Sequence, residues 1–166
     1  MTRPSRNSTI DVAVSIRRPA ADIYEFYRDF RNLPKFLGDV MSIELDGPTT
    51  SHWTIQGPLG VRVSWVAEVT DDRADELIRY EVKVFRGLAT TWEIHFTPEP
   101  GTDRTEVREV MTIPFARFAR AGLALMGRFP AEEVSANLRR LKQLMEDGRV
   151  TDCSYAVAGK FDVTPS

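Results

Sequence analysis

Apolar and polar residues alternate along much of the chain, as they do in a β-strand that buries one face. Near the N-terminus, Ile10, Val12, Val14 and Ile16 occupy every second position. The clearest alternation in the chain covers residues 61–69. Further alternating stretches cover residues 41–45, 53–55, 78–84, 92–96 and 107–113. The pattern therefore predicts a series of seven strands.

Short segments rich in glycine and proline separate several of these strands. Examples are Asp46-Gly47-Pro48, Gly57-Pro58-Leu59-Gly60 and Pro98-Glu99-Pro100-Gly101. Such residues favour tight turns, and tight turns join antiparallel neighbours. Because mostly polar residues stand between the apolar positions, we expect an antiparallel sheet with one face in solvent and one face in the core.

Two segments show helical spacing instead. After the first strand, apolar residues recur every three or four positions at Ile23, Phe26, Tyr27 and Phe30. Pro34 is expected to end or bend this helix, and residues 33–37 to form a second short turn. Because this helical pair is too small to form a core alone, we expect it to pack on the sheet.

A longer helical segment runs from residue 115 to about residue 147, and Pro130 interrupts it. The apolar residues of its second half, three or four positions apart, are Val134, Leu138, Leu141, Leu144 and Met145. The residues expected on its outer side are Arg139, Arg140 and Lys142. This spacing predicts a C-terminal helix whose apolar stripe lies against the sheet.

The length of 166 residues suits one domain, predicted over residues 8–148, with tails over residues 1–7 and 149–166. Apolar residues make up 42% of the chain and charged residues 28%, which is typical of a soluble globular protein. The net charge of -2 provides no positive field for a nucleic acid, so we expect no nucleic-acid partner.

The chain has a single cysteine, Cys153, so it cannot form an internal disulfide, and no His/Cys cluster supports a metal site. This composition is compatible with a reducing compartment, and we expect a cytoplasmic protein. The basic N-terminal residues lack the apolar stretch of a signal peptide. No run approaches the roughly 18 apolar residues of a membrane span. We predict neither a metal nor an organic cofactor.

Five short motifs, taken together, resemble one known family. They are residues 29–36 (DFRNLPKF), 51–53 (SHW), 57–58 (GP), 65–70 (WVAEVT) and 137–144 (NLRRLKQL). They look like the bacterial polyketide cyclase/dehydrase branch of the START-like (SRPBCC) superfamily, and the resemblance covers roughly residues 8–148. It implies an α+β helix-grip fold (START/Bet v 1-like), in which a curved seven-stranded antiparallel sheet surrounds a long C-terminal helix. The resemblance also implies two short helices after the first strand and an apolar cavity between sheet and helix.

Large aromatic residues fall on the apolar phase of four strands. Inward rings of this size suit flat, multi-ring or isoprenoid ligands, although they can also serve only to fill the core. The residues predicted to line a ligand pocket are Trp53, Trp65, Tyr80, Trp92, Met111, Leu125, Met126 and Phe129.

Glu109 is a carboxylate at a position where the alternation predicts an apolar residue. On the phase set by Val107, Met111 and Ile113 it points inward. A desolvated carboxyl group has a raised pKa and can act as a general acid or base, and Tyr80 is a second candidate for proton transfer. A bulge that turns Glu109 outward, or an ion pair with an arginine, would explain it without catalysis.

Residues 115–129 combine small and bulky apolar residues with Arg117, Arg120 and Arg128. Gly122 and Gly127 weaken a helix here. Three roles stay open for this segment: a lid over the cavity mouth, an amphipathic patch in transient contact with a membrane, or a helix that packs on the sheet.

The resemblance implies no single function, because the superfamily includes cyclases, lipid and quinone carriers, and proteins without an assigned ligand. Our preferred hypothesis is the binding of a small hydrophobic ligand, such as a polyketide, an isoprenoid or quinone, or a lipid-like molecule, in the internal cavity. The first alternative is a polyketide aromatase/cyclase or dehydratase that uses a cavity carboxylate. The second is an interaction protein whose cavity is vestigial.

Overall fold

The computed structural model describes residues 7–85, 88–114 and 130–161 of the chain. Its strands are β1 (Ser8–Ile16), β2 (Val40–Leu45), β3 (Thr50–Gln56), β4 (Arg62–Arg73), β5 (Leu77–Phe85), β6 (Leu88–Pro98) and β7 (Thr105–Ile113). Its helices are α1 (Ala20–Arg28), the short 3-10 helices η1 (Phe30–Lys35) and η2 (Pro58–Gly60), and α3 (Pro130–Asp147). No helix in these described ranges is long and apolar enough to cross a bilayer.

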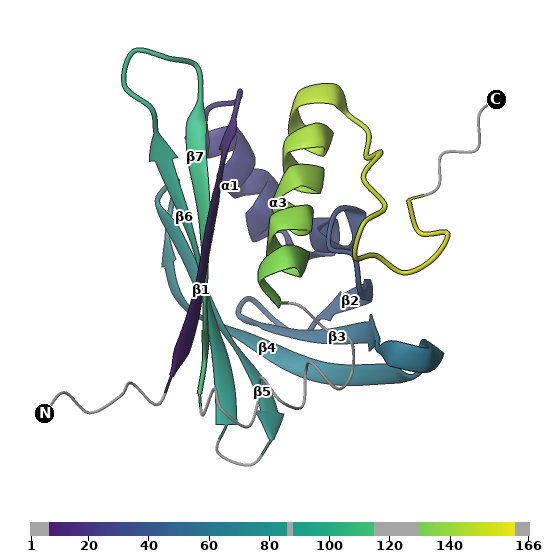
Figure 1. Cartoon of the computed structure of the whole chain (residues 1–166). Helices are drawn as coiled ribbons and strands as arrows, with labels where there is room; N and C mark the ends of the chain where they lie inside the picture. Colours follow the sequence, from purple (N-terminus) through teal and green to yellow (C-terminus); the bar gives the residue numbers. More distant parts are fainter. Residues whose placement is uncertain (1–6, 86–87, 115–129, 162–166) are drawn as a thin grey trace, which may run out of the picture.

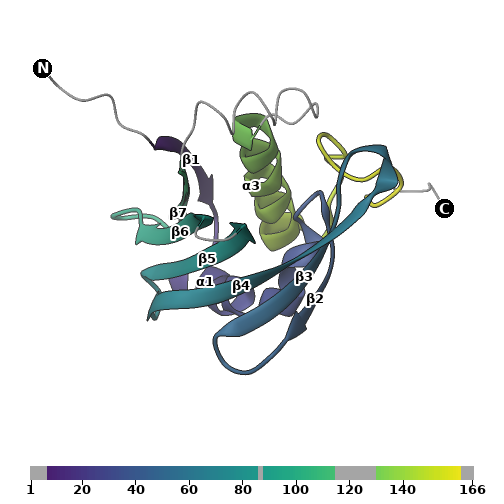
Figure 2. The same cartoon turned by 90° about the horizontal axis from the view of Figure 1, so that it is seen from below.

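The seven strands form one antiparallel sheet in the order β1-β7-β6-β5-β4-β3-β2. Each strand from β2 to β7 therefore pairs with its neighbour in the sequence, whereas β1 pairs with β7, the last strand. The sheet curves, and α3 lies in its concave side, as the two views of Figures 1 and 2 show. The predicted α+β helix-grip architecture is confirmed.

The two short helices after β1 cover part of the concave face. Ile23 and Tyr27 of α1 and Leu33 of η1 are fully buried. The break between the helices differs from the prediction, because α1 ends at Arg28 and Pro34 lies inside η1. Asp29 causes the break: its backbone is extended, and its side chain accepts a hydrogen bond of 3.1 Å from the Arg31 amide.

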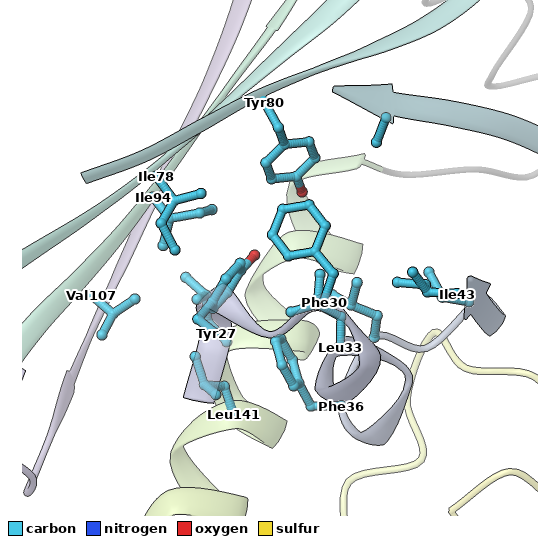
Figure 3. Close-up of a cluster of buried hydrophobic side chains, with 14 of the residues drawn as sticks. Tyr27, Phe30, Leu33, Phe36, Ile43, Ile78, Tyr80, Ile94, Val107 and Leu141 are labelled. Carbon is cyan, nitrogen blue, oxygen red and sulfur yellow. The ribbon is translucent and has the colours of Figure 1, made fainter. Parts of the chain in front are cut away.

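The C-terminal helix packs its predicted apolar stripe against the core. Val134, Leu138 and Leu141 are buried, as the spacing predicted, and Leu141 belongs to the same buried cluster as Tyr27 of α1 (Figure 3). The Lys142 ammonium group donates a hydrogen bond of 2.6 Å to the Ser15 carbonyl oxygen of β1. These contacts fix the helix along one edge of the sheet.

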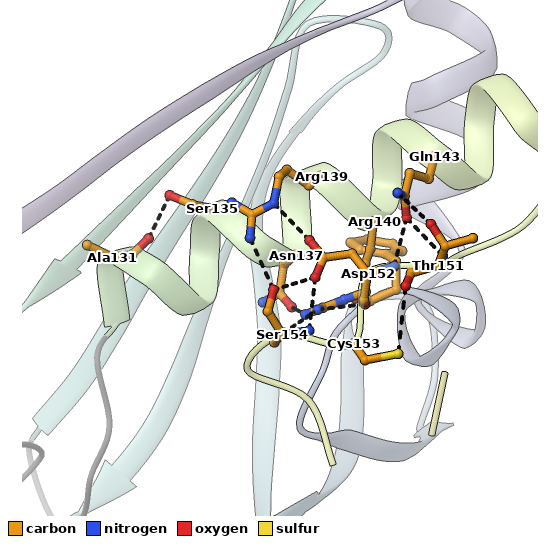
Figure 4. A network of polar contacts seen from close by, with 11 residues as sticks. Ala131, Ser135, Asn137, Arg139, Arg140, Gln143, Thr151, Asp152, Cys153 and Ser154 are labelled. Atoms are coloured by element: carbon orange, nitrogen blue, oxygen red, sulfur yellow. Dashed lines mark hydrogen bonds and ion pairs between the residues drawn. The ribbon is translucent and has the colours of Figure 1, made fainter. Parts of the chain in front are cut away.

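The prediction that Arg140 lies on the outer side of this helix is wrong. Its side chain is fully buried, because the chain after α3 folds back over it. The guanidinium group donates hydrogen bonds of 2.6 Å to the carbonyl oxygens of Phe36 and Ser154, and one of 2.5 Å to Asn137 Oδ1. Figure 4 shows this network, in which Arg140 joins α3 to the C-terminal segment.

The described part of the C-terminal segment, residues 149–161, is held by further polar contacts. The Val157 amide donates to the Gly38 carbonyl oxygen at 2.9 Å. The Lys160 ammonium group donates to the carbonyl oxygens of Leu37 and Val40, and burial lowers its pKa to about 8. A side chain at Gly38 would not fit, because its Cβ would lie 2.4 Å from the Tyr155 carbonyl oxygen. The segment therefore closes over the η1–β2 connection.

Candidate functional site

A row of aromatic rings crosses the concave face of the sheet. Tyr80 of β5 lies between Trp53 of β3, with ring centroids 5.7 Å apart, and Trp92 of β6, with centroids 6.1 Å apart. The planes of Tyr80 and Trp92 differ by 5°, so these rings are stacked. From the other side, Phe30 of η1 meets the Tyr80 ring edge-on at 5.3 Å (Figure 3). Three of the predicted pocket residues are thus brought together.

The remaining predicted pocket residues have different positions. Trp65 of β4 stands directly opposite Trp53 and is half-buried. Its indole N–H is buried without a hydrogen-bond partner, whereas that of Trp53 donates to Ser51 Oγ at 2.8 Å. Met111 of β7 stands opposite Trp92 and is buried. Three further predicted residues, Leu125, Met126 and Phe129, lie outside the described residues, as does the whole predicted lid over 115–129.

Glu109 lies inside the protein, as the alternation predicted. Its neighbours in the sheet are Val12 of β1 and Ile94 of β6, both apolar. The side chain is 1% exposed, and its Oε2 atom has no hydrogen-bond partner. Burial alone raises the pKa of Glu109 from 4.5 to about 8. At pH 7 the group is therefore mainly an uncharged carboxylic acid.

The two alternative explanations for Glu109, a bulge and an ion pair, can be tested among the described residues, which do not include Arg117, Arg120 and Arg128. The register of β7 with β1 and with β6 is regular at this position, so no bulge turns the side chain outward. The arginine nearest along the strand, Arg108, points to the outer face and pairs with Asp11 and Glu106. Within the described ranges, Glu109 makes no ion pair. Its role in catalysis stays a prediction.

Two tyrosine hydroxyl groups lie beside this carboxyl group. Tyr27 of α1 is fully buried, and its hydroxyl makes no hydrogen bond of normal length, although the Tyr80 hydroxyl lies near enough to interact with it. Burial, followed by the neighbouring Tyr80 and Glu109, raises the pKa of Tyr27 well above 10. Burial and then Glu109 do the same for the pKa of Tyr80. Figure 3 shows both hydroxyl oxygens directed into the space between α1 and the sheet.

Sequence reasoning missed Tyr27, because its spacing places it only on the apolar stripe of a short helix. A signal was present, since a tyrosine on a buried stripe brings a hydroxyl group that needs a partner in the core. What the sequence could not provide was the partner, because α1 and β7 are far apart in the chain. The three groups come from α1, β5 and β7 and meet only in the folded protein.

This arrangement supports one kind of chemistry. Two phenols and a neutral carboxylic acid offer O–H donors in an apolar surrounding, and none of them carries a positive charge. A carboxylic acid that burial keeps neutral can donate a hydrogen bond or a proton to a substrate oxygen. The same group can take a proton when its pKa lies close to the working pH.

A depression of about 340 Å³ is open to solvent beside α3, and it does not involve the aromatic row. It is lined by Ala131, Glu132, Ser135, Arg139 and Tyr155. The first four belong to α3 and Tyr155 belongs to the C-terminal segment; Figure 4 labels Ala131, Ser135 and Arg139. The internal pocket between sheet and helix, part of whose predicted wall lies in residues 115–129, stays a prediction.

Comparisons with known proteins agree with the fold. The protein DR_A0006 from Deinococcus radiodurans is 29% identical, with a TM-score of 0.64 over 85% of this chain and 99% of that chain. The protein TTHA0849 from Thermus thermophilus is 21% identical, with a TM-score of 0.66 over 85% of this chain and 99% of that one. The di-domain ARO/CYC protein BexL from the BE-7585A biosynthetic pathway is 19% identical, with a TM-score of 0.67 over 86% of this chain. The match spans 51% of BexL, about half of its length.

A search of curated proteins gave no match. A family model described as polyketide cyclase / dehydrase and lipid transport matches residues 8–146, which is most of the chain. The sequence motifs, the curved sheet around α3 and this match agree, and the chain belongs to the polyketide cyclase/dehydrase and lipid transport family.

Proposed function

We propose that this protein binds a small hydrophobic molecule of polyketide, quinone or lipid-like character between the concave face of the sheet and α3. One observation carries the proposal: the interior holds an aromatic row together with polar atoms that have no partner. The unpartnered atoms are Tyr27 Oη, Trp65 Nε1 and Glu109 Oε2. A buried polar group without a hydrogen bond costs about 1–3 kcal/mol, so most buried groups have a partner. A bound molecule would supply the missing partners.

The test uses a neutral hydrophobic dye, N-phenyl-1-naphthylamine, titrated into the purified protein while dye fluorescence is recorded. We expect saturable binding of one dye per chain. Trp92→Ala should weaken it by about tenfold, because the variant removes one ring of the aromatic row; this equals a loss of roughly 1.4 kcal/mol. Leu45→Ala is the control, since Leu45 is 48% exposed on the edge strand β2.

Native mass spectrometry of the protein as purified then searches for a ligand retained from the cell. A retained isoprenoid, lipid or polyketide would identify the ligand class. Absence of saturable dye binding, together with no retained molecule, would contradict the binding function and favour an interaction protein with a vestigial cavity.

The second candidate is a polyketide aromatase/cyclase or dehydratase, and Glu109 favours it. Its carboxyl group is buried and, with a pKa raised to about 8, can exchange a proton near neutral pH. Glu109→Gln keeps the shape of the side chain but cannot exchange a proton. If the protein is such an enzyme, this variant should lose turnover of a poly-β-ketone substrate and still bind the dye. Unchanged turnover would remove Glu109 from the reaction.

A further inference from the structure

We propose that Tyr27, Tyr80 and Glu109 form a polar subsite that holds the carbonyl oxygen of an uncharged, planar ligand. The inference rests on the proposed binding function and specifies its ligand: a ring system that carries a ketone or quinone-type oxygen.

The geometry defines the subsite. The three side chains extend from α1, β5 and β7 into one region of the interior, and each is nearly or fully buried. Tyr27 Oη and Glu109 Oε2 make no hydrogen bond of normal length, and the Tyr80 hydroxyl is a close neighbour of Tyr27. Glu109 lies close enough to Tyr27 to act on its pKa, and oxygens in one buried region that lack hydrogen bonds of normal length indicate a place for one more polar atom.

The chemistry of the surrounding groups selects the ligand atom. Val12 and Ile94 flank Glu109 in the sheet, so neither β1 nor β6 presents a charge to it. The groups that face it from α1 and β5 are the neutral phenols of Tyr27 and Tyr80. Asp39 is a further acidic group that acts electrostatically on Tyr80. No cation faces the subsite from these four described elements, so within them a carboxylate ligand would lose its hydration without gaining a counter-ion.

A carbonyl oxygen suits this set of donors. It has two lone pairs and no proton, so it can accept O–H bonds from Tyr27 and from the protonated Glu109 at once. The pKa of Glu109, raised to about 8 by burial, keeps that proton in place at neutral pH. Above pH 8 the carboxylate loses its donor and repels the lone pairs of the ligand. Affinity for the ketone should therefore fall as Glu109 ionises.

The aromatic row selects for a planar ring, whereas the polar subsite selects for the carbonyl oxygen. Tyr80 belongs to both features, because its ring stacks on Trp92 while its hydroxyl reaches the subsite. A planar ligand whose ring lies along the row would place a substituent oxygen near Tyr27 and Glu109. The subsite is thus expected to orient the ligand as well as to bind it.

The experiment compares two probes of nearly equal shape, 2-acetylnaphthalene and 2-ethylnaphthalene, by equilibrium dialysis at pH 6.5 and pH 9. The wild type should bind the ketone about tenfold more tightly at pH 6.5, as expected for about two hydrogen bonds. This preference should largely disappear at pH 9. The infrared carbonyl band of the bound ketone should lie below its frequency in hexane.

Tyr27→Phe and Glu109→Leu should each reduce the preference for the ketone at pH 6.5 and leave 2-ethylnaphthalene binding within about twofold. Tyr24→Phe is the matched control, because Tyr24 lies on the same helix but donates its hydroxyl to Asp72 at 2.6 Å. Equal affinity of the wild type for both probes would overturn the subsite and leave the binding function intact. Binding of neither probe would overturn both.

Discussion

Replacing Glu109 by glutamine should remove a pH dependence of folding stability that the native protein carries across neutral pH. The pKa of Glu109 is about 8 in the folded protein, against 4.5 when the group is exposed. The folded state therefore holds this proton more tightly than the unfolded state does. The stability that the group contributes is complete below pH 4.5 and is lost progressively as the pH rises to about 8.

The size of the effect follows from the gap between the two pKa values. One pKa unit corresponds to about 1.4 kcal/mol, so the full gap corresponds to about 5 kcal/mol. Structural relaxation and water that enters the interior reduce such values, and we expect about 2–5 kcal/mol between pH 5 and pH 8. This is a large fraction of the roughly 5–15 kcal/mol by which most domains are stable.

The assay is urea denaturation followed by tryptophan fluorescence at pH 5, 6, 7 and 8. The free energy of unfolding of the wild type should fall relative to that of Glu109→Gln by about 1 kcal/mol per pH unit. A difference in the free energy of unfolding that is the same at every pH would not test the prediction, because a buried amide also needs hydrogen-bond partners. The test is how the difference between the two proteins changes with pH. Glu106→Gln, on the outer face of the same strand, is the control. Its free energy of unfolding should change with pH in the same way as that of the wild type.

Lys160 also has a strongly shifted pKa, but it acts mainly outside this pH range. The pKa of Lys160 is lowered to about 8, so its effect on stability appears above pH 8. Parallel curves for the wild type and Glu109→Gln from pH 5 to pH 8 would refute the reasoning. They would show that Glu109 is hydrated or partnered in solution, and the polar subsite would lose its neutral acid.

Three further predictions concern α3 and the segment that follows it. Leu141→Ala should lower the free energy of unfolding by about 2–5 kcal/mol in urea denaturation, because Leu141 is fully buried, and a loss below about 1 kcal/mol would contradict that burial. Gly38→Ala should cost about 1–3 kcal/mol and raise amide hydrogen exchange at Val157, since its Cβ would collide with the Tyr155 carbonyl oxygen; unchanged exchange would show that the segment is not held there. Burial raises the pKa of Asp152, but hydrogen bonds from Ser154 and Arg139 outweigh this and hold it at about 2. Its contribution to stability is therefore present above pH 3.8 and lost as the pH falls toward 2, so Asp152→Asn should flatten the acid unfolding curve between these values.

Local periodicity was sufficient for much of the fold. Alternation with a period of two placed Glu109 and the aromatic residues of four strands on one face, because successive side chains of a strand point to opposite sides. Helical spacing placed Leu138 and Leu141 in the core for the same kind of reason. It did not find the end of α1, because the break depends on a hydrogen bond from the Arg31 amide to the Asp29 side chain rather than on apolar spacing.

Arg140 shows where periodicity fails. Its position on α3 lies outside the apolar stripe, and a charged residue there is normally in solvent. It is buried because backbone carbonyl oxygens of Phe36 and Ser154 surround its guanidinium group, and these come from segments before and after the helix. The spacing of apolar residues along one helix does not show whether another segment of the chain will fold back over that helix.

The sequence by itself determined which side chains share one face of a strand or helix, since that depends on the geometry of a single element. It thereby placed the carboxyl group of Glu109 on the same face of its strand as Val107 and Met111. Only the tertiary structure decided that Tyr27 of α1 and Tyr80 of β5 would face that carboxyl group, and that two of the three groups would lack partners. The physical reason is that the pairing of β1 with β7 and the packing of α1 on the sheet are contacts between distant parts of the chain, which form only when the whole core assembles.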